Sequence, residues 1–287
     1  MTGVPKSALK LVKYIEQQLP GVYPQEELYS MGRLIVEQLF NLTYTDIITD
    51  KPLETGGDLN EKISQIIKRL KNHEPVQYIL GQAPFYGREF HVTPDVLVPR
   101  QETEELVDMI IKENAGKRLR ILDIGTGSGC IAITLSLELP ECEVWACDIS
   151  EGALGVAQKN AGALGGKVSF FRTDILTDGL MQGPFDVIVS NPPYVCEGEK
   201  PLLEKNVLEY EPPLALFVPD EDPLVFYRKI AEQAHGQLSG TGVLYFEINE
   251  SLGEDLCKML NTMHFVPQII NDVNRKDRFI RAEQEKK

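Results

Sequence analysis

The four residues Asn191, Pro192, Pro193 and Tyr194 have the groups needed to hold a planar nitrogen group. They follow the apolar run 185–190, which predicts a buried strand. The two prolines fix φ and remove two backbone donors, so the chain leaves the sheet as a stiff turn. The Asn191 amide oxygen and the Pro192 carbonyl can then accept both N–H bonds of one NH2 group, and the Tyr194 ring can cover that group. The plain alternative is a proline-rich turn that only ends a strand.

A glycine-rich turn upstream predicts a ligand site at the same edge of the sheet. It follows the apolar run 120–124, and glycines let the backbone approach a ligand closely. Asp148 ends a second apolar run, 144–147, where an acid can accept hydrogen bonds from ribose hydroxyls. The carboxyl ends of strands in open α/β sheets are where ligands bind. The residues of the turn are Gly125, Thr126, Gly127, Ser128 and Gly129.

The same turn nearly fits a dinucleotide fingerprint. Gly127, Gly129 and Ala132 satisfy G-x-G-x-x-A, and Asp148 follows at roughly the expected distance, so the turn alone is also compatible with NAD. Asp123 argues against NAD, because a carboxylate directly before the turn repels a pyrophosphate and suits a cationic ligand. The 191–194 turn has no role in hydride transfer.

A third predicted strand, 168–172, is followed by an acid. Asp174 can accept a hydrogen bond from an adenine amino group, with Ile175 against the face of the ring. The alternative for Asp174 is an acid in a surface turn.

Taken in this order, the glycine turn, the two acids and the Asn-Pro-Pro-Tyr turn resemble S-adenosylmethionine-dependent methyltransferases that modify exocyclic nitrogen. Longer stretches are similar to the release-factor glutamine methyltransferases, and the likeness extends over about residues 75 to 282. These stretches are 75–81 (PVQYILG), 85–92 (FYGREFHV), 96–107 (VLVPRQETEELV) and 276–280 (KDRFI).

The resemblance implies a cofactor, a substrate and roles for the site residues. The cofactor is S-adenosylmethionine, and the substrate is the glutamine of the Gly-Gly-Gln loop in peptide chain release factors. Residues 125–129 and Asp148 would hold the methionine and ribose ends of the cofactor, with Asp174 and Ile175 at the adenine. Residues 191–194 would hold the acceptor amide and carry the catalysis, with Asn191 also beside the cofactor. Arg100 and Glu102 either rim the cofactor pocket or only cap a helix and pair at the surface.

The chain departs from the family pattern at three places. Gln101 stands where a second proline is usual, and Asn249 stands where a glycine is usual. Residues 218–224 replace a more glycine-rich loop. The departures at Asn249 and 218–224 concern the rim of the site, and none of the three falls in the methyl-transfer motif.

Two rival functions fit parts of the pattern. Adenine-N6 methylation of DNA or RNA presents a similar planar NH2 group, but a flipped base needs a basic channel and stacking aromatic rings. The net charge is −14, and residues 75–287 hold 20 basic and 33 acidic side chains, which argues against direct nucleic-acid binding. A non-catalytic module that senses the cofactor is the second rival, and the complete acceptor motif argues against it.

The remaining composition indicates a soluble cytoplasmic protein. The chain has no apolar run long enough to span a bilayer and no hydrophobic signal region at its start. Five cysteines without a C-x-x-C pair predict no structural disulfide, and four scattered histidines predict no metal site. We expect a monomer.

The pattern of apolar residues predicts two kinds of architecture. Apolar residues at helical spacing predict a small N-terminal helical bundle, and from residue 119 onward strands alternate with helices. That alternation predicts an α/β fold with a doubly wound, mostly parallel, Rossmann-like methyltransferase sheet. Residues 267–270 and 279–282 are expected to form a closing antiparallel pair. The predicted domains are a helical domain (1–74), a linking hairpin (75–98) and a methyltransferase domain (99–287). The family resemblance implies that the helical domain is a substrate-recognition domain, whereas the sequence pattern alone is also compatible with a bundle that only packs.

Overall fold

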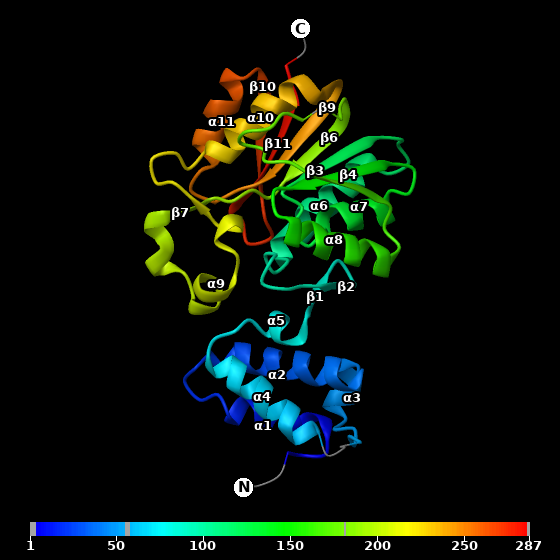
Figure 1. The fold of residues 1–287 in the computed structure, drawn as a ribbon, viewed down its shortest axis with the longest axis vertical. Helices are drawn as coiled ribbons and strands as arrows, with labels where there is room; N and C mark the ends of the chain where they lie inside the picture. The colour runs from blue at the N-terminus through cyan, green and yellow to red at the C-terminus, as the bar shows by residue number, and fades with distance from the viewer. Residues whose placement is uncertain (1–3, 55–57, 181, 286–287) are drawn as a thin grey trace. The chain divides into compact units, whose positions relative to one another are not determined.

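The computed structural model describes residues 4–54, 58–180 and 182–285, and the chain divides into two compact units (Figure 1). The first unit comprises Met1–Gly81 and Glu204–Tyr210, and the second comprises Gln82–Leu203 and Glu211–Lys287. Within the described ranges, every helix is too short or too polar to traverse a bilayer. These units are defined by packing, whereas the predicted boundaries at residues 74 and 98 separate domains of different function. Those boundaries therefore stay a prediction.

The first unit is helical because its apolar side chains recur at helical spacing and meet in one core. Leu11, Val12 and Ile15 of α1 are fully buried, as are Ile35 and Val36 of α2. The helices of this unit are α1 (Ala8–Gln17), α2 (Gln25–Phe40), α3 (Tyr44–Ile48), α4 (Leu59–Lys71), α5 (Val76–Leu80) and α9 (Lys205–Tyr210).

A local capping residue sets the start of α3. Thr43 caps α3 in a capping box, because its hydroxyl accepts from Asp46 N at 3.2 Å and its own N–H donates to Asp46 Oδ2 at 2.9 Å. Asp58 precedes α4, and its side chain makes no capping hydrogen bond. The helix α5 differs from the extended segment that the sequence predicts for this stretch, and Gly81 ends it at φ +74°.

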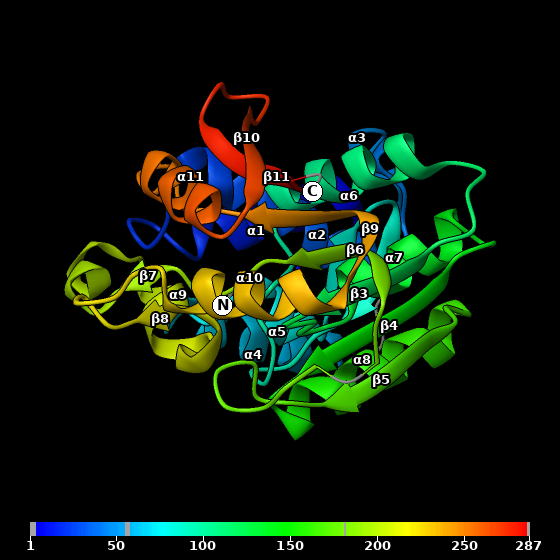
Figure 2. The ribbon, with the colours of Figure 1, turned by 90° about the horizontal axis from the view of Figure 1, so that it is seen from above.

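The second unit is built on a seven-stranded sheet in the order β10-β11-β9-β6-β3-β4-β5, and Figure 2 shows β9, β6, β3, β4 and β5 following one another in this order. The pairs β4–β5, β3–β4, β3–β6 and β6–β9 are parallel, whereas β11 pairs antiparallel with β9 and with β10. The expected α/β fold and the closing antiparallel pair are therefore confirmed. The strands of the sheet are β3 (Arg120–Ile124), β4 (Glu143–Asp148), β5 (Val168–Arg172), β6 (Phe185–Ser190), β9 (Leu238–Glu247), β10 (Phe265–Asn271) and β11 (Asp277–Gln284).

Helices cover both faces of this sheet because successive strand residues alternate between two cores. Leu122 and Ile188 belong to the core under α10 and α11, whereas their neighbours Ile121 and Val187 belong to the core under α6 and α7. Figure 1 shows the two groups of helices on opposite sides of the strands. The covering helices are α6 (Gln101–Asn114), α7 (Cys130–Glu138), α8 (Glu151–Leu164), α10 (Val225–Gln237) and α11 (Gly253–Thr262).

Shorter elements complete the second unit. The hairpin β1–β2 is antiparallel and pairs Phe85 with Arg88. A two-stranded parallel pair, β7–β8, follows the Asn191–Tyr194 turn. These elements are β1 (Gln82–Phe85), β2 (Arg88–His91), β7 (Val195–Cys196), β8 (Phe217–Val218) and the 3-10 helices η1 (Glu197–Leu202) and η2 (Pro213–Ala215).

Candidate active site

A cavity of about 320 Å³ lies at the carboxyl ends of three neighbouring parallel strands, within the size range of ligand pockets. The register pairs Ile124 of β3 with Cys147 of β4 and with Ser190 of β6, so the residues that follow these strands emerge side by side. Ser190 Oγ also donates to the Ile124 carbonyl at 2.7 Å, which ties two of the strand ends together. The predicted residues that line the cavity are Gly125, Gly127, Asp148, Asp174, Ile175, Asn191, Pro192 and Pro193.

The glycine turn after β3 leaves open space beside the cavity, and backbone N–H groups of the turn bond to carbonyls of the protein. Gly125 and Gly127 have φ of +74° and +54°, and a Cβ on either would meet nothing within 4 Å. The N–H groups of Gly125 and Thr126 donate to the Cys147 carbonyl at 2.9 and 3.0 Å, and Gly129 N donates to the Thr126 carbonyl at 2.8 Å. Because these amides are already bonded, they are not aimed at a ligand pyrophosphate, which disfavours the dinucleotide interpretation.

Asp148, at the end of β4, holds this turn and also faces the cavity. Its Oδ2 accepts from Gly127 N and its Oδ1 accepts from Ser150 N, both at 2.9 Å. Burial raises the pKa of the Asp148 carboxyl, and these backbone hydrogen bonds oppose the rise. Each oxygen of a carboxylate has two acceptor sites, so Asp148 retains lone pairs for ligand hydroxyls.

Asp174 and Ile175 form a neighbouring part of the cavity wall. Asp174 Oδ1 accepts from Leu176 N at 2.9 Å, and no described residue donates a hydrogen bond to the second oxygen. Ile175 is 8% exposed and packs into the core under α10 and α11, so its position on the wall is fixed. The pair thus offers an acceptor beside an apolar surface.

The turn after β6 presents two acceptors at the same cavity. Asn191 Nδ2 lies 3.5 Å from Thr103 Oγ1, which places its NH2 group toward α6. Within residues 4–54, 58–180 and 182–285, no donor bonds to Asn191 Oδ1 or to the Pro192 carbonyl. An amide oxygen and a carbonyl on adjacent residues of a stiff turn are the acceptors that a planar NH2 group requires.

The other predicted residues of the motifs support the cavity from behind. The Thr126 hydroxyl donates to Asp123 Oδ2 at 2.7 Å, the Ser128 carbonyl accepts from Asn160, and Gly129 directly precedes α7. Tyr194 does not line the cavity, and its side chain packs against the core under α10 and α11. The role of the Tyr194 ring as a cover for the acceptor therefore stays a prediction without a contact to support it.

Asn160 of α8 is a structural residue that sequence motifs do not reveal. It is 2% exposed, and its Nδ2 donates to the carbonyls of Ser128 and His91 at 2.8 and 2.9 Å. Its Oδ1 accepts from His91 N at 2.7 Å, so one amide joins the glycine turn to β2. The sequence has no signal for this role, because Asn160 directly follows two other polar residues of α8, Gln158 and Lys159.

The rest of the cavity wall comes from residues to which the sequence assigns no role in the site, and the charge of the whole wall is negative. Three acids line the cavity, Asp95, Asp148 and Asp174, and none of its described lining residues is lysine or arginine. A cavity of this charge suits a cation and is unfavourable for a phosphate chain. The additional wall residues include Val96, Leu97, Pro212, Leu214, Ala215, Phe226 and Ile230.

The cavity has a feature to match each part of an adenosyl sulfonium ligand. The open glycine turn, the acid at the end of β4, the acid with its apolar neighbour after β5, and the negative charge each match one part of that ligand. With the mostly parallel sheet and its antiparallel closing pair, they define a Rossmann-like S-adenosylmethionine-dependent methyltransferase.

The chain belongs to the release factor glutamine methyltransferase family, to which relatives of nearly its full length are assigned by name. The relative from Bacteroides thetaiotaomicron is 48% identical and covers 95% of this chain and 99% of its own length. The relative from Flavobacterium psychrophilum is 44% identical and covers 93% of this chain and 95% of its own length. The methyltransferase small domain family matches residues 101–209, and the PrmC N-terminal domain family matches residues 10–81.

A solved structure supports the fold. A methyltransferase from Pyrococcus furiosus superposes with a TM-score of 0.53 over 78% of this chain and 99% of its own, at 19% identity. At that identity the likeness concerns the fold alone.

Replacing Asp148 by alanine should weaken S-adenosylmethionine binding by about 1–3 kcal/mol, because ligand hydroxyls lose their acceptor and Gly127 N loses its anchor. Titration calorimetry measures the change. Glu151→Ala is the matched control, since it removes the same charge from an exposed residue nearby that does not line the cavity. An Asp148→Ala protein with wild-type affinity would mean that the ribose is held elsewhere.

Proposed function

We propose that this protein transfers the methyl group of S-adenosylmethionine to the side-chain amide nitrogen of the glutamine in the Gly-Gly-Gln loop of peptide chain release factors. The names of its relatives support release factors as the substrate. The observation that carries the chemistry is the pair of unbonded acceptors, Asn191 Oδ1 and the Pro192 carbonyl, on the wall of the cavity.

The cofactor would be held by the residues at the ends of β3, β4 and β5. The open face of Gly125 and Gly127 gives room for its methionine end, Asp148 offers acceptors to its ribose, and Asp174 with Ile175 receives its adenine. When bound, S-adenosylmethionine supplies a methyl group that the positive sulfur already activates.

The acceptor amide needs help from the protein because its nitrogen lone pair is delocalised into the carbonyl. If Asn191 Oδ1 and the Pro192 carbonyl accept its two N–H bonds, electron density on the nitrogen rises and the lone pair is aimed at the methyl group. Orientation of this kind is worth as much as ~7–11 kcal/mol of a barrier, and a well-placed dipole adds about 3 kcal/mol. The product proton can pass to water, so the Asn191–Tyr194 turn needs no general base.

Methylation of a release factor with radiolabelled S-adenosylmethionine tests this function. The expected result is one label per release factor, located by mass spectrometry on the glutamine, and no label in a release factor whose Gly-Gly-Gln glutamine is replaced by alanine. DNA and RNA are the comparison substrates for adenine methylation. Label in nucleic acid with none in the release factor would overturn the proposal in favour of that alternative.

Two further assignments belong to this proposal. We assign substrate recognition to residues 1–74, the link to 75–98 and methyl transfer to 99–287, which the family matches at 10–81 and 101–209 support. The monomeric state, the cytoplasmic location and the absence of direct nucleic-acid binding stay predictions from the sequence.

A further inference from the structure

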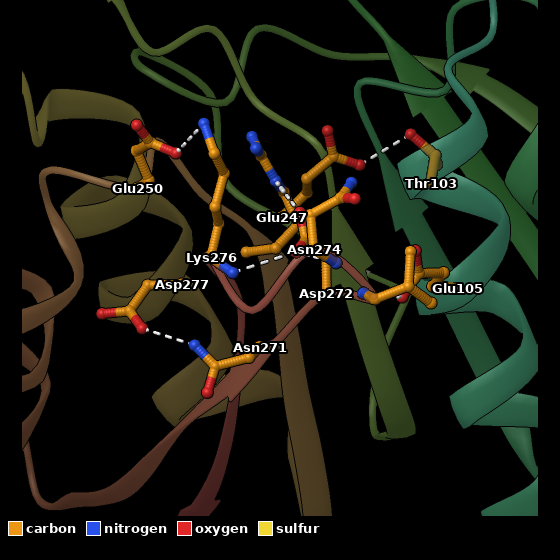
Figure 3. Close-up of polar contacts among 11 residues, drawn as sticks. Thr103, Glu105, Glu247, Glu250, Asn271, Asp272, Asn274, Lys276 and Asp277 are labelled. Atoms are coloured by element: carbon orange, nitrogen blue, oxygen red, sulfur yellow. Dashed lines mark hydrogen bonds and ion pairs between the residues drawn. The ribbon is translucent and has the colours of Figure 1, made fainter.

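A buried carboxylate lies behind the Asn191 turn. Glu247, the last residue of β9, is 1% exposed, and its Oε2 accepts a hydrogen bond of 2.6 Å from Thr103 Oγ1 (Figure 3). Thr103 lies in the first turn of α6 and is 3% exposed. Neither residue lines the cavity, so any effect on the reaction must pass through a residue that does.

Asn191 lines the cavity and connects Thr103 and Glu247 to it. Its Nδ2 lies 3.5 Å from the same Thr103 oxygen, so the three side chains form one chain in which Asn191 donates to Thr103 and Thr103 donates to Glu247. The first of these contacts is long, and hydrogen bonds of catalytic sites often tighten only when the substrate is bound.

The direction of this chain follows from its protons. A threonine hydroxyl has one proton, and an ionised carboxylate can only accept. The Thr103 proton is therefore directed to Glu247, and the Thr103 lone pairs face Asn191. If the Asn191 amide were turned over, its oxygen would meet those lone pairs without a proton between them. The ionised Glu247 therefore favours the orientation in which Asn191 Nδ2 points toward Thr103 and Oδ1 points away from it.

Protonation of Glu247 would reverse the chain. Burial raises its pKa to about 7, while the Thr103 hydrogen bond and Arg278 oppose the rise. A protonated Glu247 can donate to Thr103, which frees the Thr103 proton for Asn191 Oδ1. Burial also raises the pKa of Tyr194, Tyr227 and Cys130, so those groups stay protonated near neutral pH. The groups facing Glu247 are Arg278 on β11, Arg100 and Glu102 beside the start of α6, Tyr194 after β6, Tyr227 on α10 and Cys130 on α7.

We propose that Thr103 and Glu247 are positioning residues for methyl transfer, which fix the Asn191 amide with Nδ2 toward α6 and Oδ1 toward the acceptor nitrogen. A terminal amide otherwise occupies two broad orientations that differ by half a turn. The inference rests on the proposed function, in which Asn191 Oδ1 receives the acceptor.

Thr103→Val and Thr103→Ser test the relay, since valine keeps the shape and loses the hydroxyl. With valine we expect kcat on the release factor to fall about fivefold to tenfold, which corresponds to one lost hydrogen bond. The Kd for S-adenosylmethionine should change little. The melting temperature should fall, because Glu247 loses a buried hydrogen bond, and serine should restore most of both kcat and stability. A Thr103→Val protein with wild-type kcat would overturn the inference, as would a loss that serine does not repair.

Glu247→Gln tests the charge, and nuclear magnetic resonance tests it without any substrate. In the wild type, kcat should rise about threefold to fivefold between pH 6 and pH 8, because the pKa of Glu247 is about 7 and the protonated form should keep only the activity of a protein without the relay. Glutamine should remove this rise. The Asn191 side-chain ¹⁵N–¹H signals, assigned by their loss in Asn191→Ala, should shift over the same pH range in the wild type and not in Glu247→Gln.

These readouts separate the two proposals. A wild-type protein that labels no release factor but shows the pH-dependent Asn191 signals would contradict the proposed function and retain the orienting role of Glu247. Asn191 signals that do not respond to pH, or that respond equally in Glu247→Gln, would overturn the inference even if the release factor is methylated.

Discussion

Replacing Asn191 by alanine should lower kcat for release-factor methylation by about 10²–10³-fold, the loss typical of removing one preorganised group that stabilises a transition state. The variant removes one of the two acceptors on the cavity wall and leaves the Pro192 carbonyl in place. Binding of S-adenosylmethionine should be nearly unchanged, because Asp148, Asp174 and the glycine turn are intact. Single-turnover kinetics and titration calorimetry measure the two quantities separately.

Asn261→Ala is the matched control. It makes the same change of side chain at an exposed position of α11 that does not line the cavity. It should leave both kcat and cofactor affinity unchanged. Wild-type turnover in Asn191→Ala would refute the two-acceptor mechanism. A loss of cofactor affinity equal to the loss in kcat would instead assign Asn191 to cofactor binding.

The positions of the strand ends could be predicted from the sequence because short apolar runs followed by glycine, acid or proline have few alternatives. The runs before Gly125, Asp148 and Asn191 are strands β3, β4 and β6, and their parallel register brings the three ends to one cavity. The alternation of strands and helices was sufficient to predict this geometry without any long-range information.

Three features could not be predicted because they depend on packing between distant segments. The five-residue stretch Val76–Leu80 is too short for its period to distinguish helix from strand, and the structure makes it α5. Tyr194 follows the prolines in sequence, but its direction is set by the core under α10 and α11. Phe226 and Leu214 reach the cavity from segments without motifs.

The Arg100 side chain shows how a motif residue can act through a distant partner. Arg100 Nη2 donates to both carboxylate oxygens of Glu211 at 2.8 Å, and the Glu211 side chain is only 2% exposed. Neither residue lines the cavity, but Pro212, Leu214 and Ala215, which follow Glu211, do. Arg100 therefore anchors one wall of the cavity instead of forming its rim.

Replacing Arg100 by methionine should destabilise the protein by about 2–3 kcal/mol at pH 8. Breaking a fully buried pair costs about 3–5 kcal/mol, and the Arg100 side chain is 34% exposed, so the effect should be smaller. Burial raises the pKa of Glu211, and Arg100 opposes that rise. Without Arg100 the folded protein favours the protonated acid more strongly, so the loss of stability should be small at pH 5 and grow as pH rises. Urea denaturation at both pH values measures it.

A double variant separates the buried charge from the lost packing. Arg100→Met combined with Glu211→Gln removes both charges, so much of the stability at pH 8 should return and the added pH dependence should disappear. If the single and double variants are equally unstable at pH 8, the Arg100 stem contributes through packing, and the ion pair is not what holds this wall in place.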